Sequence, residues 1–356
     1  MTKAVIIGAG KTGRGFIGRL AAEAGCEILF VDQNANLVDH LNTAGAFTIS
    51  FFGGVREPLQ VKNFNACTWD DANLAGADLI FVSVGGQNLE DAGIMLKEKL
   101  PHDIVHHIIT CENASSPAET LLSMMERDDV IASEAAVFCT TIEDGTLDII
   151  SENYPYLQCN ADKLRGYVPG IASVKPVDNF GNFLTRKLYT YNASSCVIAY
   201  LGAAKGYTVY SDAANDPEIL ALLDRSYAQI NRAMCLEFGY DPEDQAEFAR
   251  LSRSKFISAA IRDTVERNAR DVARKMAPGE RIIGIMQLIK KHGGDTSALE
   301  MTAAAALAYT ADPNWEKLKK EKAPADILRE HCGLDSNDAL GQRILRIYKE
   351  GLRWGL

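Results

Sequence analysis

The chain has 356 residues, of which 47% are hydrophobic, and 37 Lys and Arg against 47 Asp and Glu give it a net charge of −10. This length predicts two globular domains with ample material for two cores, which excludes a disordered or fibrous chain. Nucleic acids and anionic membranes require a basic surface, so we expect neither as a partner.

The eight cysteines are widely spaced and form no C-x-x-C pair. This pattern predicts neither a zinc site nor a disulfide framework, so we expect no metal and reduced, buried cysteines. The chain enters an apolar run directly after Met-Thr-Lys, without the charged leader of a secretory signal. No run reaches the roughly 18 apolar residues of a membrane helix, so we expect a cytoplasmic protein.

The first half alternates short apolar runs with helical stretches. The runs are Ala4–Ile7, Ile28–Val31, Leu79–Val84, Ile104–Ile109 and Val130–Ala132. Continuous apolar strands separated by helices indicate a parallel sheet that is covered on both faces. We therefore predict an α/β fold, with a Rossmann-type doubly wound parallel sheet in residues 1–175 and a mainly α-helical domain in residues 176–356. Two prolines within Tyr167–Pro176 mark the boundary.

A glycine-rich turn joins the first predicted strand to an amphipathic helix. It reads G-x-G-x-x-G and consists of Gly8, Ala9, Gly10, Lys11, Thr12 and Gly13. The first glycine permits a tight turn, the second lets a pyrophosphate approach the backbone, and the third lets the helix pack on the strand. The amide groups at the start of the helix then bind the anion. The side chains of Lys11 and Arg14 leave two alternatives open, since they are either solvated or face the phosphate.

An acidic residue strengthens the prediction of a dinucleotide site. The second strand, Glu27–Val31, ends in Asp32, close to the roughly 20-residue separation at which an acid meets the adenosine ribose. A carboxylate there repels the 2′-phosphate of NADP, so we expect NAD as the cofactor. Val84 and Gly85 end a third strand, where either the cofactor lies against the backbone or packing alone requires the glycine.

The second half carries apolar residues at helical spacing. The segments are Asn182–Leu201, Pro217–Phe238, Asp241–Asn268, Ser297–Tyr309 and Ala339–Leu352. In the first segment, Lys187, Asn192 and Ser195 fall within an arc of about 140° of an ideal helix. A lysine that is partly buried near other cations has a lowered pKa and serves as a general base. On these residues alone, a solvated helix face remains the alternative.

The segment 263–275 predicts one charged helix with acid–base pairs four residues apart. The pairs are Asp263 with Arg267, Glu266 with Arg270, and Asp271 with Lys275. These pairs alone are typical of a helix face that is exposed to solvent. Arg274, however, has no acid four residues earlier, and together with Arg270 and Lys275 it suits a cationic cup for a phosphate.

Four stretches occur in the order seen in one enzyme family: Gly8–Gly18, Cys111-Glu112-Asn113, Lys187–Gly202 and Glu266–Ile283. Over nearly its whole length the chain resembles the mannitol-1-phosphate 5-dehydrogenase branch of the polyol-specific long-chain dehydrogenases. The resemblance implies an NAD-dependent enzyme that interconverts a secondary alcohol of a polyol, sugar or sugar phosphate and the ketone. It also favours the phosphate cup.

The family motif K-x4-N-x2-H implies specific roles. Lys187 matches the general base that takes the alcohol proton, and Asn192 matches the asparagine that holds the oxygen as it becomes a carbonyl. Asn113 matches the asparagine that completes the oxyanion site near the nicotinamide.

Two positions depart from the family pattern. Ser195 replaces the motif histidine, and a serine donates a hydrogen bond but cannot share a proton near neutral pH. Because that histidine also holds the sugar chain, Ser195 puts the identity of the substrate in question. Asp144 matches an aspartate that binds a polyol hydroxyl, but Gly145 replaces the arginine that follows it.

Two other functions remain open from the sequence. A protein on the same scaffold can bind NAD without net redox chemistry, as an epimerase, a lyase or a sensor does. A hydroxy-acid or opine dehydrogenase would use Arg270 and Arg274 as a carboxylate clamp. In each case we expect a small-molecule partner and a monomer or homodimer.

Overall fold

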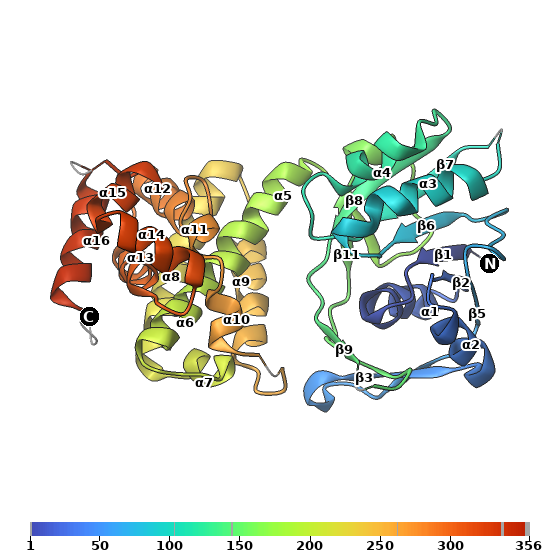
Figure 1. The fold of residues 1–356 in the computed structure, drawn as a ribbon, viewed down its shortest axis with the longest axis horizontal. Coiled ribbons are helices and arrows are strands. Elements are labelled where there is room, and N and C mark those ends of the chain that lie inside the picture. Colours follow the sequence, from blue (N-terminus) through green and yellow to red (C-terminus); the bar gives the residue numbers. More distant parts are fainter. Residues whose placement is uncertain (1, 103, 144, 262, 336–337, 353–356) are drawn as a thin grey trace. The chain divides into compact units, whose positions relative to one another are not determined.

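The structure is a computed structural model that describes residues 2–102, 104–143, 145–261, 263–335 and 338–352. The chain divides into two compact units, Met1–Gly181 and Asn182–Leu356 (Figure 1). The first unit extends beyond the predicted boundary at residue 175, because β12 (Val174–Val177) pairs with β11 (Leu157–Asn160). The proline that suggested a boundary, Pro176, is tolerated because β12 is an edge strand.

An eight-stranded sheet forms the centre of the first unit, in the order β12-β11-β8-β7-β6-β1-β2-β5. The six strands not yet bounded are β1 (Lys3–Ile7), β2 (Glu27–Val31), β5 (Phe64–Cys67), β6 (Leu79–Val82), β7 (His106–Thr110) and β8 (Val130–Ala136). All neighbours pair in parallel except β8 and β11. The strand predicted from Ile104 begins at His106 instead, because Ile104 and Val105 are 48% and 57% exposed.

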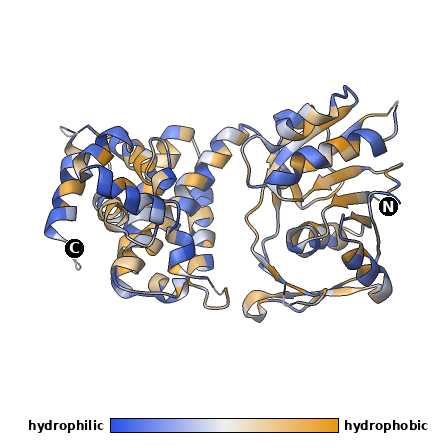
Figure 2. Cartoon of the chain, in the orientation of Figure 1, coloured by the Kyte–Doolittle hydropathy of each residue, from blue (hydrophilic) through white to orange (hydrophobic). Residues whose placement is uncertain are grey.

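Helices cover both faces of this sheet, as the continuous apolar strands predict. Ala4 and Ile6 of β1 belong to one hydrophobic core, whereas Val5 and Ile7 belong to the other, since successive strand side chains point to opposite faces. The helices of this unit are η1 (Gly13–Gly18, a π-helical turn), α1 (Arg19–Glu23), α2 (Ala35–Ala44), α3 (Leu89–Lys99) and α4 (Pro117–Met125), together with the short 3-10 helices η2 (Phe52–Gly54), η3 (Gly86–Asn88) and η4 (Asp162–Leu164). In Figure 2 the strands of the sheet are hydrophobic and the helices carry hydrophilic residues.

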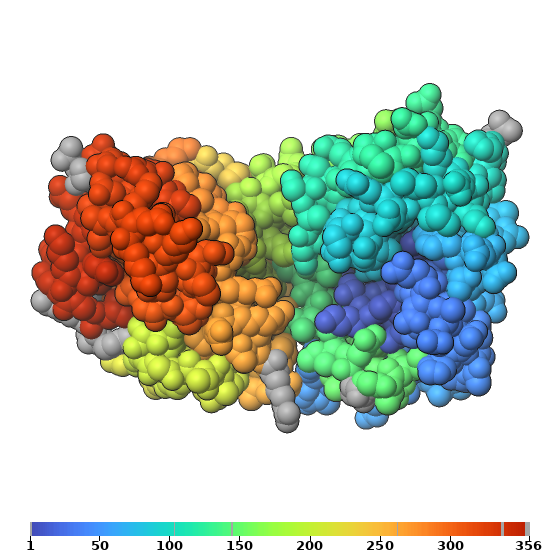
Figure 3. Space-filling view, in the orientation of Figure 1, coloured from blue at the N-terminus to red at the C-terminus, as the bar shows by residue number. Residues whose placement is uncertain are grey.

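A second sheet of four strands lies beside η1, in the order β4-β3-β10-β9. Its strands are β3 (Phe47–Phe51), β4 (Leu59–Val61), β9 (Thr141–Glu143) and β10 (Ile149–Ser151). Because β10 pairs with β3, a segment near residue 150 lies against the N-terminal part of the same unit, as the green and blue surfaces in Figure 3 show. A Cβ at Gly15 would come within 2.3 Å of Ile149, so the glycine allows η1 to pack closely on this sheet.

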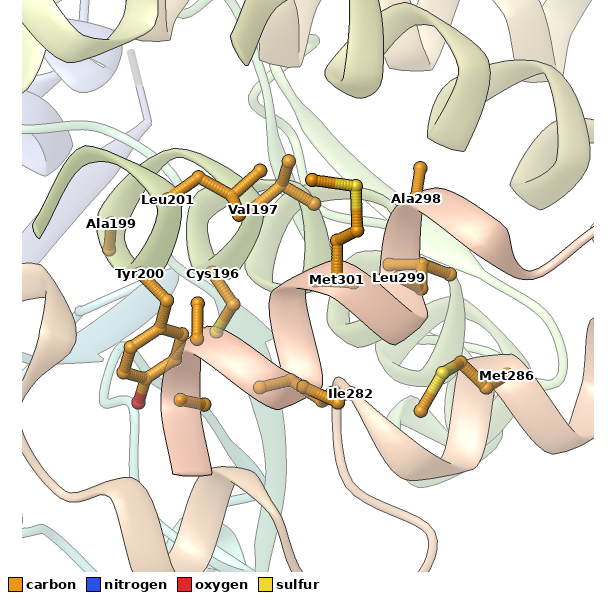
Figure 4. Close-up of a cluster of buried hydrophobic side chains, with 14 of the residues drawn as sticks. Cys196, Val197, Ala199, Tyr200, Leu201, Ile282, Met286, Ala298, Leu299 and Met301 are labelled. Atoms are coloured by element: carbon orange, nitrogen blue, oxygen red, sulfur yellow. The ribbon is translucent and has the colours of Figure 1, made fainter. Parts of the chain in front are cut away.

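The second unit is mainly helical in its described residues, apart from loops and one isolated antiparallel bridge between Val209 and Thr264. Its elements are α5 (Phe180–Lys187), η5 (Leu188–Asn192), α6 (Ala193–Ala204), α7 (Tyr210–Ala214), α8 (Pro217–Phe238), α9 (Pro242–Ile257), α10 (Val265–Ala269), α11 (Val272–Lys275), α12 (Ile283–Lys291), α13 (Ser297–Ala308), α14 (Pro313–Glu321), α15 (Pro324–Glu330) and α16 (Ala339–Glu350). The central helix α6 is buried along most of its length. Its side chains, among them Val197, lie against those of α13, among them Met301 (Figure 4). Among the described residues, no helix is both long and apolar enough to cross a membrane.

Two predicted helices end earlier than their patterns indicate. The segment 241–268 divides into α9 and α10, since Ser258 is extended (ψ 113°) and Thr264 begins a new helix by accepting a hydrogen bond from Arg267 N. The helix predicted to reach residue 352 ends at residue 350, because Gly351 has φ 83°.

The charged helix predicted over residues 263–275 is also broken. Asp271 has a left-handed backbone (φ 64°) and separates α10 from α11. The cause lies far away in the sequence, because one carboxylate oxygen of Asp312 accepts hydrogen bonds from Asp271 N at 2.8 Å and Val272 N at 3.0 Å. This contact stabilises the start of α11 and changes the partners of its charged side chains.

Candidate active site

The three glycines of the first motif serve different purposes. A Cβ at Gly8 (φ +94°) would lie 2.1 Å from Ser83 O, and a Cβ at Gly13 would lie 1.9 Å from Gly8 O. A Cβ at Gly10 would meet no atom within 4 Å. Gly8 and Gly13 are therefore required for packing within the unit, whereas Gly10 leaves open space beside the start of a helix, where an anion can approach the backbone.

A pocket of about 480 Å³ lies beside this loop and is lined by Gly8, Gly10, Asp32, Ser83 and Val84, among others. Asp32 accepts a hydrogen bond from Ala9 N at 2.7 Å and another from Asn34 N at 2.9 Å. Its carboxylate therefore braces the loop and also borders the pocket. The open space at Gly10 and an acid at the end of β2 fit a bound NAD.

The prediction that the Arg14 side chain is either solvated or faces a phosphate is wrong. The residue is 1% exposed, and its guanidinium donates to Ala9 O at 2.8 Å and to Glu143 Oε1 at 2.6 Å. Burial lowers the pKa of Arg14, and the charge of Glu143 opposes that effect. A buried guanidinium needs such partners. Arg14 therefore joins the glycine loop to β9, while Lys11 is exposed and Thr12 is half-buried.

The turn after β6 is held by Glu112, a residue to which the sequence assigned no role. Glu112, which follows β7, accepts a hydrogen bond from Gly85 N at 2.7 Å and is also hydrogen-bonded to the Val84 backbone. Burial raises the pKa of Glu112, whereas these two backbone bonds lower it. The only sequence signal was its position beside Asn113, which is exposed. Asp144 lies outside the described residues.

The Lys187 motif contains a π-helical turn that the periodicity did not predict. α5 ends at Lys187, and in η5 the amide of Ala193 donates to Leu188 O, five residues earlier. A turn that closes between residues five apart contains an additional residue compared with an α-helix. The wider turn reduces the angle of about 140° that an ideal helix places between Lys187 and Asn192. Such turns are frequent at functional sites.

The surroundings of Lys187 lower its pKa to about 8. Burial is the largest cause, followed by the positive charges of Lys255 in α9 and Arg281, which precedes α12. A lysine with this pKa is partly neutral at physiological pH, which a general base requires. The sequence did not reveal which cations surround it, because they are 68 and 94 positions away.

A basic pocket of about 220 Å³ lies in the second unit. It brings together five predicted site residues: Asn192, Ser195, Arg270, Arg274 and Lys275. It also includes Arg267, which was not predicted as a site residue, and Arg281, which the family resemblance covers beside the predicted cup. Arg267 was explained by its pair with Asp263, which is present at 2.8 Å, although the same side chain also lines the pocket.

The cations of this pocket do not have the partners that the helix periodicity predicted. Arg274 pairs with Asp271, so it does not lack an acidic partner as expected. Lys275 does not pair with Asp271 but donates to Asn268 O, and burial lowers its pKa. Both differences follow from the helix break at Asp271. Arg270 forms no ion pair within the described parts of the chain. The pocket therefore retains an excess of positive charge.

Sequence and structure comparisons agree with this architecture. The sequence matches the mannitol dehydrogenase Rossmann domain over residues 2–144 and the mannitol dehydrogenase C-terminal domain over residues 179–350. The chain belongs to the mannitol dehydrogenase family. It is thus a dehydrogenase acting on CH–OH groups, and its Rossmann domain fits NAD. The predicted fold class is confirmed.

Two solved structures share this fold. The mannitol 2-dehydrogenase of Pseudomonas fluorescens, in a ternary complex with NAD and D-mannitol, is 14% identical with a TM-score of 0.66, covering 98% of this chain and 91% of that chain. A D-sorbitol dehydrogenase in substrate-free form is 15% identical with a TM-score of 0.77, covering 97% of this chain and 92% of that chain. Within the described residues, no three His, Cys, Asp or Glu side chains gather as ligands for a metal ion.

Proposed function

We propose that this chain is an NAD-dependent dehydrogenase that interconverts a secondary alcohol of a polyol phosphate and the ketone of the corresponding sugar phosphate. The observation that carries the proposal is that Arg281, which lines the basic pocket of the second unit, is also one of the charges that lower the pKa of Lys187 to about 8. The pocket is lined by Asn192 and Ser195 together with five cationic side chains. The lysine suits proton transfer, and the cations suit an anionic substituent.

In the oxidation, Lys187 acts as the base. Its neutral amine takes the hydroxyl proton while the carbon loses hydride and the C–O bond becomes a carbonyl. NAD, when bound, supplies the nicotinamide ring that accepts this hydride. Asn192 donates its side-chain amide hydrogen to the oxygen, because a donor already in place stabilises the developing negative charge without reorganisation. The role that the family resemblance implies for Asn113, which lies in the first unit, stays a prediction.

The basic pocket would hold the phosphate. Arginine side chains bind phosphate oxygens through paired N–H groups, and Arg270, which lines the pocket, forms no ion pair with an acidic side chain among the described residues. Lys275 adds a buried donor whose own carbonyl partner, Asn268 O, is uncharged. The negative charge of a phosphomonoester therefore compensates the excess positive charge of the pocket, whereas a neutral polyol would leave it uncompensated.

Matched substrates test this proposal. Mannitol, sorbitol and fructose would each be compared with mannitol 1-phosphate, sorbitol 6-phosphate and fructose 6-phosphate by following NADH absorbance. We expect kcat/KM at least about tenfold higher for a phosphorylated member, since a hydrogen bond to a charged group contributes about 1.5–3 kcal/mol. Arg270→Ala should remove most of this preference, whereas Arg329→Ala, an arginine of α15 paired with Asp326 and Glu330, should not.

The same panel separates the alternative functions. Equal rates with and without phosphate would overturn phosphate recognition. Product formed without net change in NADH would show transient oxidation, as in an epimerase or lyase. Turnover of hydroxy acids in place of polyols would show that the arginines hold a carboxylate.

A further inference from the structure

Ser195 is held by a tyrosine from a neighbouring helix. Tyr210, the first residue of α7, is 5% exposed, and its hydroxyl donates to Ser195 Oγ at 3.0 Å. The same hydroxyl lies 3.5 Å from Ser195 O. Ser195 is only half-buried and lines the basic pocket. Ser195 Oγ has no other hydrogen-bond partner among the described residues, so its remaining hydrogen-bonding capacity is available to the pocket.

The direction of the hydrogen bond between Tyr210 and Ser195 decides whether Ser195 can donate a hydrogen bond to a substrate. Burial raises the pKa of Tyr210 well above its usual range, so the phenol keeps the proton that it donates to Ser195 Oγ. A serine hydroxyl has one proton and two acceptor sites. With one acceptor site occupied by Tyr210, Ser195 keeps its own proton for a bond into the pocket.

We propose that Tyr210 is a positioning residue that orients Ser195 as a neutral hydrogen-bond donor to an oxygen of the bound substrate. The pair thereby replaces the family histidine with a donor that does not titrate near neutral pH. This inference rests on the proposed function, because it places substrate in the basic pocket.

A second tyrosine–serine pair provides a matched control. Tyr227 of α8 donates to Ser252 Oγ of α9 at 2.9 Å, and both residues are buried. Neither side chain lines the basic pocket. If hydroxyl pairs of this kind serve only to satisfy a buried phenol, the two pairs should behave alike on substitution.

A double-mutant cycle tests the proposal. Tyr210→Phe, Ser195→Ala and the double variant would be compared with the native enzyme for kcat, KM and thermal unfolding. We expect kcat/KM to fall about fivefold to tenfold in each single variant, as loss of one neutral hydrogen bond predicts. The double variant should lose no more than the worse single variant, because the two substitutions break one chain of hydrogen bonds. Tyr227→Phe should change the unfolding temperature but leave kcat/KM within twofold.

The outcomes distinguish this inference from the proposed function. Independent, multiplicative losses in the double variant, or an unchanged kcat/KM in Tyr210→Phe, would overturn the role of Tyr210 while leaving the dehydrogenase intact. If the native protein turns over none of the substrates, the proposed function fails, and the cycle is then read from the dissociation constant of mannitol 1-phosphate by calorimetry. Coupled weakening there supports the Tyr210–Ser195 pair, and absence of binding overturns it.

Discussion

The two units assemble their sites from residues at very different sequence separations. In the first unit, the glycine loop and Asp32 lie within one strand–helix–strand segment, and Asp32 directly accepts a hydrogen bond from Ala9 N. In the second unit, the basic pocket combines Asn192 with residues as distant as Arg281. A local motif therefore defines the cofactor site, whereas the substrate site depends on how several helices pack.

The units nevertheless share one local feature. Each places a π-helical turn inside its functional motif, η1 in the glycine-rich helix and η5 in the Lys187 helix. In η1 the glycines let the turn pack against Gly8 and Ile149. In η5 the turn changes which side chains share a face. The contrast shows that a π-helical turn serves packing in one unit and side-chain placement in the other.

The largest expected effect separates the chemistry of the second unit from cofactor binding by the first. Lys187→Ala removes the base, and general-base catalysis contributes about 10²–10⁴-fold, so kcat should fall by that factor. The dissociation constant of NAD, measured by NADH fluorescence and calorimetry, should stay the same. Lys290→Ala, an exposed lysine paired with Asp338, is the control. Unchanged turnover in Lys187→Ala would disprove its role as the base.

Two alanine substitutions sharpen the distinction between packing and cofactor binding within the glycine loop. Gly13→Ala creates a close contact with Gly8 O, and overpacking costs about 1–3 kcal/mol, so its unfolding temperature should fall by several degrees. Gly10→Ala meets no protein atom and should unfold like the native chain. It should still weaken NAD binding about tenfold, because the methyl group occupies the space left for the pyrophosphate. Normal NAD binding by Gly10→Ala would contradict the placement of the pyrophosphate beside Gly10.

The pH dependence tests the long-range electrostatics of the second unit. Only the neutral form of Lys187 accepts a proton, so kcat/KM for alcohol oxidation should rise with pH and level off above about 8. Lys255→Gln removes a positive charge that disfavours the protonated form, so the midpoint should move to higher pH. A midpoint that does not move would show that the charge of Lys255 does not contribute to the lowered pKa of Lys187.

The smallest expected effect tests the brace behind the cofactor pocket. Glu112→Ala removes the acceptor from Gly85 N, so the turn after β6 loses a fixed position. We expect the KM for NAD to rise about two- to tenfold, as loss of one hydrogen bond predicts, with kcat little changed. Glu119→Ala, an exposed residue of α4 that pairs with Lys163, is the control. Equal effects of the two substitutions on the KM for NAD would show that Glu112 has no specific role in the cofactor site.

Much of the fold was predictable because its signals are local. The strands at residues 4–7, 28–31 and 79–82 are continuous apolar runs, and such runs in a parallel sheet are buried on both faces. The predictions from the sequence were wrong where a residue far away in the chain overrides the local pattern. Asp312 holds the start of α11 inside the helix predicted over residues 263–275, and Glu143 pairs with the buried Arg14.

The sequence by itself determined the two-part architecture, the glycine loop with its acid, and the lysine and asparagine five positions apart. These features depend on residue type and short spacing, which are printed in the chain. Only the tertiary structure decided that η5 narrows the angle between Lys187 and Asn192, that Tyr210 holds Ser195, and that five cations line one pocket. Those facts depend on the packing of helices far apart in the sequence, and a pKa near 8 for Lys187 follows from that packing because burial and nearby charge set it together.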